Sequence, residues 1–343
     1  WNEALDAVAG KLQQGKTAVA GISGDRVSNE DLFLFQKLFR KGLGSNNIDL
    51  ANRRLAGGDV VAKVGISQGS NLLNLGQGDA IIVVATDLHE EVPVWWLRVK
   101  QAAQRGASLV VLNVRPTRLD DCSRHVIHYY PGKAVSTVRQ LVNDAKVAAA
   151  DADNSPLKAA ADVIMQANNV VAFYGAEGLT YEETDAVAKL LANLLLIKNE
   201  EAHAGRPNNG LIPVWPHNNT QGAWDMGIHP ALEPGYKPVA NPGMNAAEMY
   251  AAAQSGAQKA LFVLAADPIG DGLMADRGKL DFLVVQELFL TETAAQADVV
   301  LPAQSWAERE GTFTSGERRV QRYYPAIQPV GETRPDWQIL AQI

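Results

Sequence analysis

Residues 80–112 read AIIVVATDLHEEVPVWWLRVKQAAQRGASLVVL, and this stretch decides the fold. Its first run, Ala80–Ala85, and its last run, Ser108–Leu112, are short, apolar and rich in β-branched residues. Such runs without polar alternation are expected for buried parallel strands. Between them, Pro93 suits the first turn of a helix that runs to Arg105. Strand, helix and strand in this order predict a parallel crossover unit.

The same alternation continues through most of the chain. Further strands are predicted at Thr17–Ile22, Val170–Tyr174, Ala260–Leu264 and Phe282–Gln286. Further helices are predicted from the cap Ser28, with Asp31 three residues on, to Gly42, and at Ala134–Ala149, Leu157–Ala167, Tyr181–Leu196 and Ala246–Gln254. The sequence therefore predicts an α/β protein with two doubly wound, mainly parallel sheets and flanking helices.

Composition limits the functions that the chain can have. It has 343 residues, of which 47% are hydrophobic, and a net charge of −7, which suits two globular domains without a nucleic-acid surface. The single cysteine, Cys122, excludes a disulfide and a four-thiolate iron–sulfur cluster within this chain. No apolar run of 18 residues and no signal peptide is present, so no membrane insertion is expected. Because the chain begins at Trp1, we expect an excerpt of a longer protein.

Several short motifs suggest sites without defining a reaction. Glycine turns at Gly21–Gly24 and Gly175–Gly178 follow predicted strands, but neither completes a dinucleotide or phosphate-loop motif. His89, Glu90 and Glu91 are consecutive, which fits no zinc spacing and favours a solvated loop. Asn199 to Asn245 is a long irregular segment, and such loops are often functional. These residues alone assign neither a catalytic group nor a metal site.

Several longer stretches resemble the molybdopterin oxidoreductases, the superfamily of formate dehydrogenases, nitrate reductases and DMSO reductases. They occur in family order and are NNTQGAWDMG at 218–227, LTETAAQADVVLP at 290–302, EREGTFT at 308–314, RRVQ at 318–321, GSNNID at 44–49 and AADP at 265–268. The resemblance implies two α/β domains, one interrupted by the other. Residues 1–54 and about 236–343 would form the first domain, and 55–235 the inserted one.

The resemblance also implies a cleft for a pterin nucleotide. The positions that correspond to family contacts are Thr86, Asp87, Glu91, Asn113, Arg115, Gly175, Gln221 and Asp267. Asn and Gln side chains can hydrogen-bond a purine edge, and Asp can accept from a guanine N–H. We expect these residues to form a vestigial cleft.

One departure from the family pattern concerns the metal. In active relatives the GSNNID-type segment leads to a Cys or selenocysteine that ligates molybdenum, followed in formate dehydrogenases by a His. Those positions here are Leu55 and Ala56, and a leucine side chain offers no lone pair to a metal. The resemblance therefore implies that molybdenum chemistry has been lost.

The absence of the metal ligand and the run from Glu91 to Val94, followed by Arg98, make the chain similar to one particular kind of relative. It resembles the molybdopterin-like peripheral-arm subunit of bacterial NADH-quinone oxidoreductase (complex I). We therefore expect a structural and docking element without catalytic residues and without a cofactor in this fragment. Iron–sulfur clusters would lie in the part of the parent chain before Trp1. The partners would be other hydrophilic-arm subunits, on the cytoplasmic side of the inner membrane, with neither nucleic acid nor direct membrane insertion.

Two alternatives stay open at this point. The NNTQGAWDMG loop also fits a fragment of an active molybdenum-dependent formate dehydrogenase, which would bind molybdopterin guanine dinucleotide. That alternative requires a thiolate or selenolate near Leu55, whereas Cys122 lies far downstream. The glycine turns also permit a nucleotide-binding module without a redox role.

Overall fold

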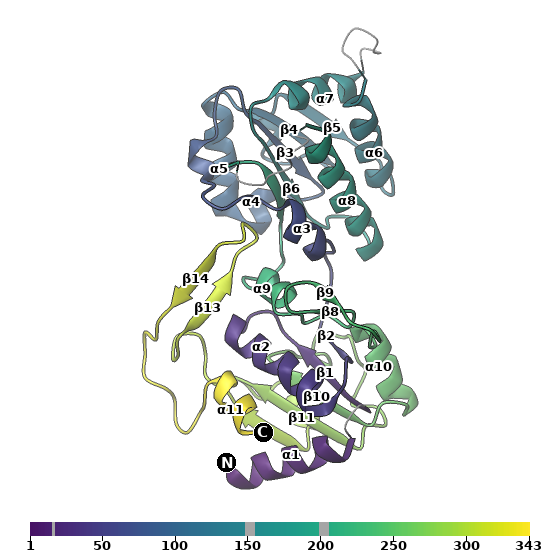
Figure 1. Ribbon diagram of the computed structural model, residues 1–343, viewed down its shortest axis with the longest axis vertical. Coiled ribbons are helices and arrows are strands. Elements are labelled where there is room, and N and C mark those ends of the chain that lie inside the picture. The colour runs from purple at the N-terminus through teal and green to yellow at the C-terminus, as the bar shows by residue number, and fades with distance from the viewer. Residues whose placement is uncertain (16–17, 148–154, 199–205) are drawn as a thin grey trace. The chain divides into compact units, whose positions relative to one another are not determined.

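The computed structural model describes residues 1–15, 18–147, 155–198 and 206–343 (Figure 1). The chain divides into two compact units: unit 1 comprises 1–53, 217–315 and 319–343, and unit 2 comprises 54–216 and 316–318. Residues 217–235, which the sequence assigned to the inserted domain, belong to unit 1 because Asn219 bonds there to Val27 O and Thr314 N. The alanine-rich stretch Lys146–Ala152, whose composition suggests a local surface linker, lies mostly outside the described residues.

Unit 1 is built on a five-stranded parallel sheet with the order β12-β11-β10-β1-β2. These strands are β1 (Val19–Ser23), β2 (Ile48–Leu50), β10 (Ala260–Leu264), β11 (Phe282–Glu287) and β12 (Val299–Pro302). Two antiparallel pairs accompany it, namely β8 (Leu232–Glu233) with β9 (Lys237–Pro238), and β13 (Gly311–Thr314) with β14 (Val320–Tyr323). The helices are α1 (Asn2–Gly15), α2 (Asn29–Lys37), α9 (Thr220–Asp225), α10 (Ala246–Ser255) and α11 (Asp336–Gln342).

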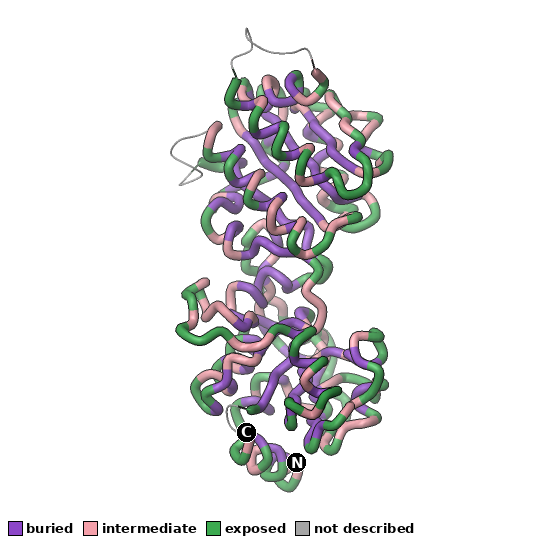
Figure 2. The backbone as a smooth tube through the Cα atoms, turned by 90° about the vertical axis from the view of Figure 1, so that its right-hand side faces the viewer, coloured by how far each residue is buried: buried purple, intermediate pink, exposed green. Residues whose placement is uncertain are grey.

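Each face of this sheet is covered by helices. Leu5, Leu32 and Ile339, from α1, α2 and α11, pack in one core with the side chains of one sheet face. Met249, Tyr250 and other side chains of α10 pack on the opposite face. The central strands are buried along their full length, and the outer faces of the helices are exposed (Figure 2). This arrangement explains why the central strands read as continuous apolar runs.

Unit 2 has a second five-stranded parallel sheet, with the order β5-β4-β3-β6-β7. Its strands are β3 (Ala80–Val84), β4 (Ser108–Asn113), β5 (His125–His128), β6 (Val170–Tyr174) and β7 (Gly210–Pro213). Its helices are α3 (Gly58–Val64), α4 (Leu88–Glu91), α5 (Pro93–Gln104), α6 (Ala134–Asp144), α7 (Pro156–Gln166) and α8 (Tyr181–Lys198). Helices α4 and α5 lie on one face of the sheet, and α6, α7 and α8 lie together on the other (Figure 1).

The two sheets have the same arrangement in a different chain order. β10, β11 and β12 correspond to β3, β4 and β5, and β1 and β2 correspond to β6 and β7. In unit 2 the chain runs through these positions continuously, whereas in unit 1 the last two positions come first in the sequence. Each sheet therefore has one point, between β1 and β10 or between β3 and β6, where the direction of winding reverses.

The predicted fold class is confirmed, and each of the six predicted strands is present. The helix capped by Ser28 has the expected capping box with Asp31, but its α-helical part ends at Lys37. Its last turn is a π-helix, Leu38–Leu43, and Gly44 in the left-handed conformation closes it in place of Gly42. The helix predicted to reach Ala149 ends at Asp144.

We expect Phe35→Ala to lower the free energy of unfolding of unit 1 by about 3–5 kcal/mol, as is usual when a buried phenylalanine is truncated. Phe35 is fully buried and contacts the rings of Phe39 and Phe262 at centroid distances of 4.9 and 5.6 Å. Phe33→Ala, on the same helix, is the matched control because Phe33 is 43% exposed. Equal shifts of the denaturant midpoint in the two variants would contradict this packing.

Candidate functional site

The carboxyl ends of β1 and β10 diverge at the winding reversal of unit 1, and open α/β sheets bind ligands at such points. Gly24, directly after β1, donates its N–H to Leu264 O at 2.7 Å. A Cβ on Gly24 would lie 2.0 Å from Ala265 O. Only glycine therefore allows the segment after β1 to approach the backbone after β10 this closely.

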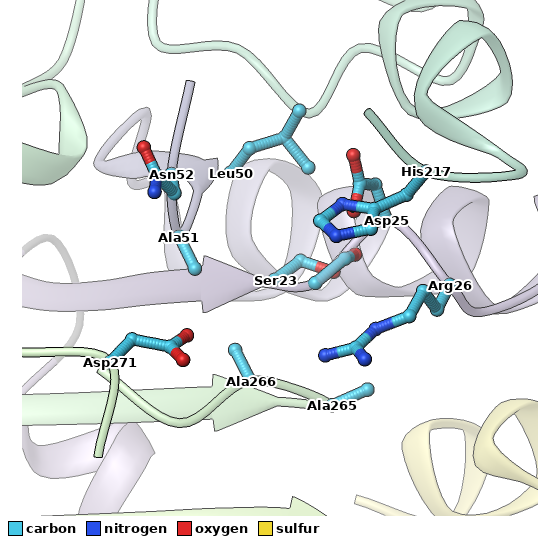
Figure 3. A pocket seen from close by; sticks show the side chains of 11 residues that line it. Ser23, Asp25, Arg26, Leu50, Ala51, Asn52, His217, Ala265, Ala266 and Asp271 are labelled. Carbon is cyan, nitrogen blue, oxygen red and sulfur yellow. The ribbon is translucent and has the colours of Figure 1, made fainter. Parts of the chain in front are cut away.

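A small cavity of about 40 Å³, the smaller cavity, opens at this point (Figure 3). Arg26 and Asp271 extend into it from opposite sides. The lining residues are Ser23, Gly24, Asp25, Arg26, Leu50, Ala51, Asn52, His217, Ala265, Ala266 and Asp271. The volume suits one or a few water-sized groups.

An ion pair forms one side of the smaller cavity. Asp25 Oδ1 lies 2.6 Å from His217 Nδ1, and Thr220 donates its hydroxyl proton to the other carboxylate oxygen. Asp25 is buried, whereas the His217 side chain is 44% exposed. A carboxylate bound to Nδ1 fixes the orientation and tautomer of an imidazole. The sequence did not reveal this pair because its members lie in distant segments and neither belongs to a recognised catalytic motif.

A larger cavity of about 280 Å³ shares Arg26, Ala265 and Asp271 with the smaller one. Its other lining residues are Val27, Asp267, Glu287, Leu288, Phe289, Thr291, Ala303, Gln304, Ser305, Trp306, Arg309 and Asp336. Phe289 and Trp306 are strongly exposed, whereas Arg309 and Asp336 are buried. The larger cavity thus combines an apolar mouth with charged groups in its floor.

The predicted site residue Asp267 lines this larger cavity. Its Oδ1 accepts hydrogen bonds from the backbone N–H and hydroxyl of Thr293, at 2.9 and 2.6 Å, and from Gly270 N. Burial alone would raise the pKa of Asp267, but these hydrogen bonds outweigh it and hold the pKa below its usual value. Asp267 is therefore a carboxylate at neutral pH.

In unit 2 the structure brings six of the predicted residues together, namely Thr86, Asp87, Glu91, Asn113, Arg115 and Gly175. They lie at or just after the carboxyl ends of β3, β4 and β6, which meet at the second winding reversal. Asp87 and Asp267 occupy equivalent places in the two units, three residues after β3 and β10.

The polar groups of this cluster are paired mainly with one another. Arg115 Nη1 lies 3.0 Å from Asp87 Oδ2, and Arg115 Nε donates to Glu177. Asn113 donates to the same glutamate at 2.9 Å. Thr86 donates its hydroxyl proton to Glu91 at 2.6 Å, while burial raises the pKa of Glu91. The sequence analysis did not single out Glu177, although it lies in the glycine turn after β6.

The remaining predicted residue, Gln221, lies in unit 1 and is fully buried. Its amide donates to Asp225 Oδ1 and to the Tyr236 hydroxyl, both at 3.0 Å. Its neighbour Asn219 is equally buried and bridges two other segments. A Cβ on Gly222 would lie 2.2 Å from Asn219 Oδ1, so the glycine of this loop is required by packing.

Two arginines hold the backbone that follows this loop. Arg40 donates to the carbonyl oxygens of Gly227, His229 and Leu232. Arg53 donates to Ile228 O and packs over the Trp224 ring at 4.3 Å. His229 packs against the same ring, and burial together with the two nearby guanidinium groups lowers its pKa to about 3.

The sequence resemblance aligns Leu55 with the metal-ligand position of active relatives, and this residue carries a hydrocarbon side chain. Leu55 is 3% exposed. The next residue, Ala56, donates its N–H to Thr184 and accepts from the Tyr174 hydroxyl at 2.8 Å. Cys122 lies beside β5, and its thiol donates to Leu119 O. Within 1–15, 18–147, 155–198 and 206–343, no group of three or more His, Cys, Asp or Glu side chains is arranged to hold a metal ion.

The fold and its two winding reversals define a class, namely doubly wound α/β proteins whose open sheets present polar groups at the carboxyl ends of their strands. The family model "Molybdopterin oxidoreductase" matches residues 1–343. The chain therefore belongs to the molybdopterin oxidoreductase family.

Curated relatives are similar over the whole chain. The NADPH-Fe(3+) oxidoreductase subunit alpha of Geobacter sulfurreducens is 32% identical, with 100% of this chain and 47% of the relative covered. The F420-dependent formate dehydrogenase subunit alpha of Methanocaldococcus jannaschii is 30% identical and the Bacillus subtilis "Probable oxidoreductase YjgC" 29%, with 59% and 41% of their lengths covered. The chain thus spans about half the length of these relatives, and it is fully covered in each alignment.

Solved structures support the fold. Acetylene hydratase from Pelobacter acetylenicus superposes with a TM-score of 0.69 at 17% identity, covering 100% of this chain and 57% of that one. A chain of the formyltransferase/hydrolase complex of Methylorubrum extorquens superposes with a TM-score of 0.65 at 16% identity, covering 99% of this chain and 94% of that one.

Among the described helices, none is long and apolar enough to span a bilayer.

We expect His229→Gln to reduce the acid sensitivity of unit 1. A histidine that stays neutral in the folded protein but takes up a proton in the unfolded chain makes the free energy of unfolding decrease as the pH is lowered. For His229 this decrease extends from about pH 6.5 down towards its pKa of about 3 in the folded protein. The loss would be up to about 1.4 kcal/mol per pH unit. Denaturant titrations between pH 6 and pH 4.5 measure it, with His128→Gln, at an exposed histidine of β5, for comparison. An unchanged slope in His229→Gln would show that His229 is not held neutral.

Proposed function

We propose that this chain is the molybdopterin-oxidoreductase-like domain of the peripheral-arm subunit of an NADH-quinone oxidoreductase, where it acts as a structural and docking element. The observation that carries the proposal is Leu55. A buried leucine stands where active relatives place a thiolate or selenolate, and a hydrocarbon side chain cannot ligate a metal. Molybdenum does not fit the residues at this position.

The cleft residues support the same reading. In unit 2 Arg115 is already paired with Asp87 and Glu177. In unit 1 the buried amide of Gln221 already donates hydrogen bonds to Asp225 and Tyr236. Polar groups that satisfy each other can hold the fold together without a cofactor.

In this proposal electrons pass through iron–sulfur clusters outside the chain, and quinone reduction takes place elsewhere in the complex. The domain contacts other hydrophilic-arm subunits on the cytoplasmic side of the inner membrane. Two findings are consistent with this position: the chain belongs to an oxidoreductase family, and none of the described helices could span a membrane.

The second candidate is a fragment of an active molybdenum-dependent formate dehydrogenase. The names of the relatives favour it over the first candidate, since they include the alpha subunit of an F420-dependent formate dehydrogenase at 30% identity. Its difficulty is again the donor set, because a ligand would have to come from a residue other than Leu55.

Elemental analysis separates the two candidates. We expect the full-length parent protein, purified from its native host, to contain no molybdenum and to release no fluorescent oxidised pterin, because Leu55 supplies no ligand. A formate dehydrogenase carried through the same purification and oxidation is the positive control. Near-stoichiometric molybdenum in the parent protein would contradict the structural role and favour the second candidate.

A further inference from the structure

Beside the sites already described, unit 1 contains a buried group of charged side chains that connects three segments. Arg309, from the segment before β13, pairs with Asp31 of α2 and with Asp336 at the start of α11; its Nη2 lies 2.9 Å from Asp336 Oδ2. All three side chains are at most 5% exposed. Asp31 also accepts from the backbone N–H of Trp337 at 2.8 Å. These bonds fix α11 to α2.

The charges in this group do not cancel. Two carboxylates share one guanidinium, so the group carries a net charge of −1 when both acids are ionised. An uncompensated charge in a buried site is costly, and proteins commonly relieve it by binding a proton. Of the other titratable groups nearby, Glu287 of β11 is a further acid, and Tyr323 of β14 is a neutral phenol whose pKa is itself raised by burial. Arg26, a cation that lines the same cavity, acts on Glu287.

A neighbouring amide provides a place for that proton. Gln286 of β11 donates its Nε2 to Asp336 Oδ1 at 2.6 Å. Its Oε1 is buried and has no hydrogen-bond partner among the described residues. Rotation of the amide would turn this oxygen towards Asp336, where it could accept a hydrogen bond from a protonated carboxyl group. The rotation exchanges the positions of Oε1 and Nε2, so Nε2 gives up its bond to Asp336 Oδ1 while Oε1, which makes no bond in its present orientation, gains one.

The group is also accessible to solvent protons. Arg309 and Asp336 both line the floor of the larger cavity, whose volume of about 280 Å³ holds several water molecules. Arg309 Nε, like Gln286 Oε1, has no partner among the described residues. Water in this cavity can therefore carry a proton to Asp336.

We propose that Asp31, Arg309, Asp336 and Gln286 form a buried proton-binding site in the floor of the larger cavity, in which Asp336 takes up the proton and Gln286 accepts its hydrogen bond. This site is independent of the complex I proposal, because it needs neither a cofactor nor a partner. Burial and the neighbouring Asp31 raise the pKa of Asp336 to about 7, which is the direction that the geometry requires. The charge of the cavity floor then changes by one unit near neutral pH.

The first test is a titration of this chain by NMR with the Asp336 carboxyl carbon and the Gln286 amide as probes. We expect both signals to shift with one shared midpoint near pH 7. A midpoint for Asp336 below about pH 5, close to that of an ordinary aspartate, would overturn the proposal. An Asp336 midpoint near neutrality without any change at Gln286 would overturn the part assigned to the amide.

The second test compares stabilities. A carboxyl group whose pKa is raised in the folded state stabilises it below the unfolded pKa, and this contribution is lost as pH rises towards the folded pKa. We expect the denaturant midpoint of the wild type to fall between pH 6 and pH 7.5 by more than that of Asp336→Asn, which imitates the protonated acid. Asp281→Asn, at a side chain that is 74% exposed, should behave as the wild type. If Asp336→Asn retained the full pH dependence, the proposal would be wrong; if that variant failed to fold, the NMR titration would still decide.

Discussion

The architecture of both units depends on crowding of the backbone where two adjacent parallel strands part. Gly24 approaches Ala265 so closely that no Cβ fits, and Gly175 approaches Ala85 and Thr86 in the same way. In each pair the alanine takes a left-handed backbone, with φ of 50° at Ala265 and 51° at Ala85. This conformation costs a non-glycine residue about 1–2 kcal/mol, which the surrounding sheet must offset. The same constraint directs the following polar residues to the carboxyl edge, where both candidate sites lie.

The strands that could be predicted from the sequence are those at or next to the centre of each sheet. They are covered on both faces, so their side chains form continuous apolar runs. In the two five-stranded sheets the four strands that were missed, β2, β5, β7 and β12, are the edge strands, with three or four residues each. β5 alternates between partly buried and exposed residues, and β2 carries Asp49, so neither has the pattern of a buried parallel strand.

The site was predictable where position along a strand determines position in space. Thr86, Asp87 and Asn113 follow neighbouring strands, so their meeting at one edge follows from the sheet order. The Asp25–His217 ion pair and the buried Arg309 group could not be found in this way, because packing between distant segments creates them. The loop at 218–227 shows a further difficulty: its motif suggests a ligand site, whereas many of its polar atoms bind the protein's own backbone and side chains.

The permuted strand order of unit 1 has a consequence for synthesis on the ribosome. All five sheet strands of unit 2 lie between residues 80 and 213, so that sheet can form as soon as this continuous stretch has emerged. β1 and β2 emerge earlier, yet β1 pairs on one side with β10, which begins at Ala260. The backbone edge of β1 that pairs with β10 therefore stays unpaired while residues 54–216 are translated. During that interval the segment presents an unpaired strand edge of the kind that chaperones shield.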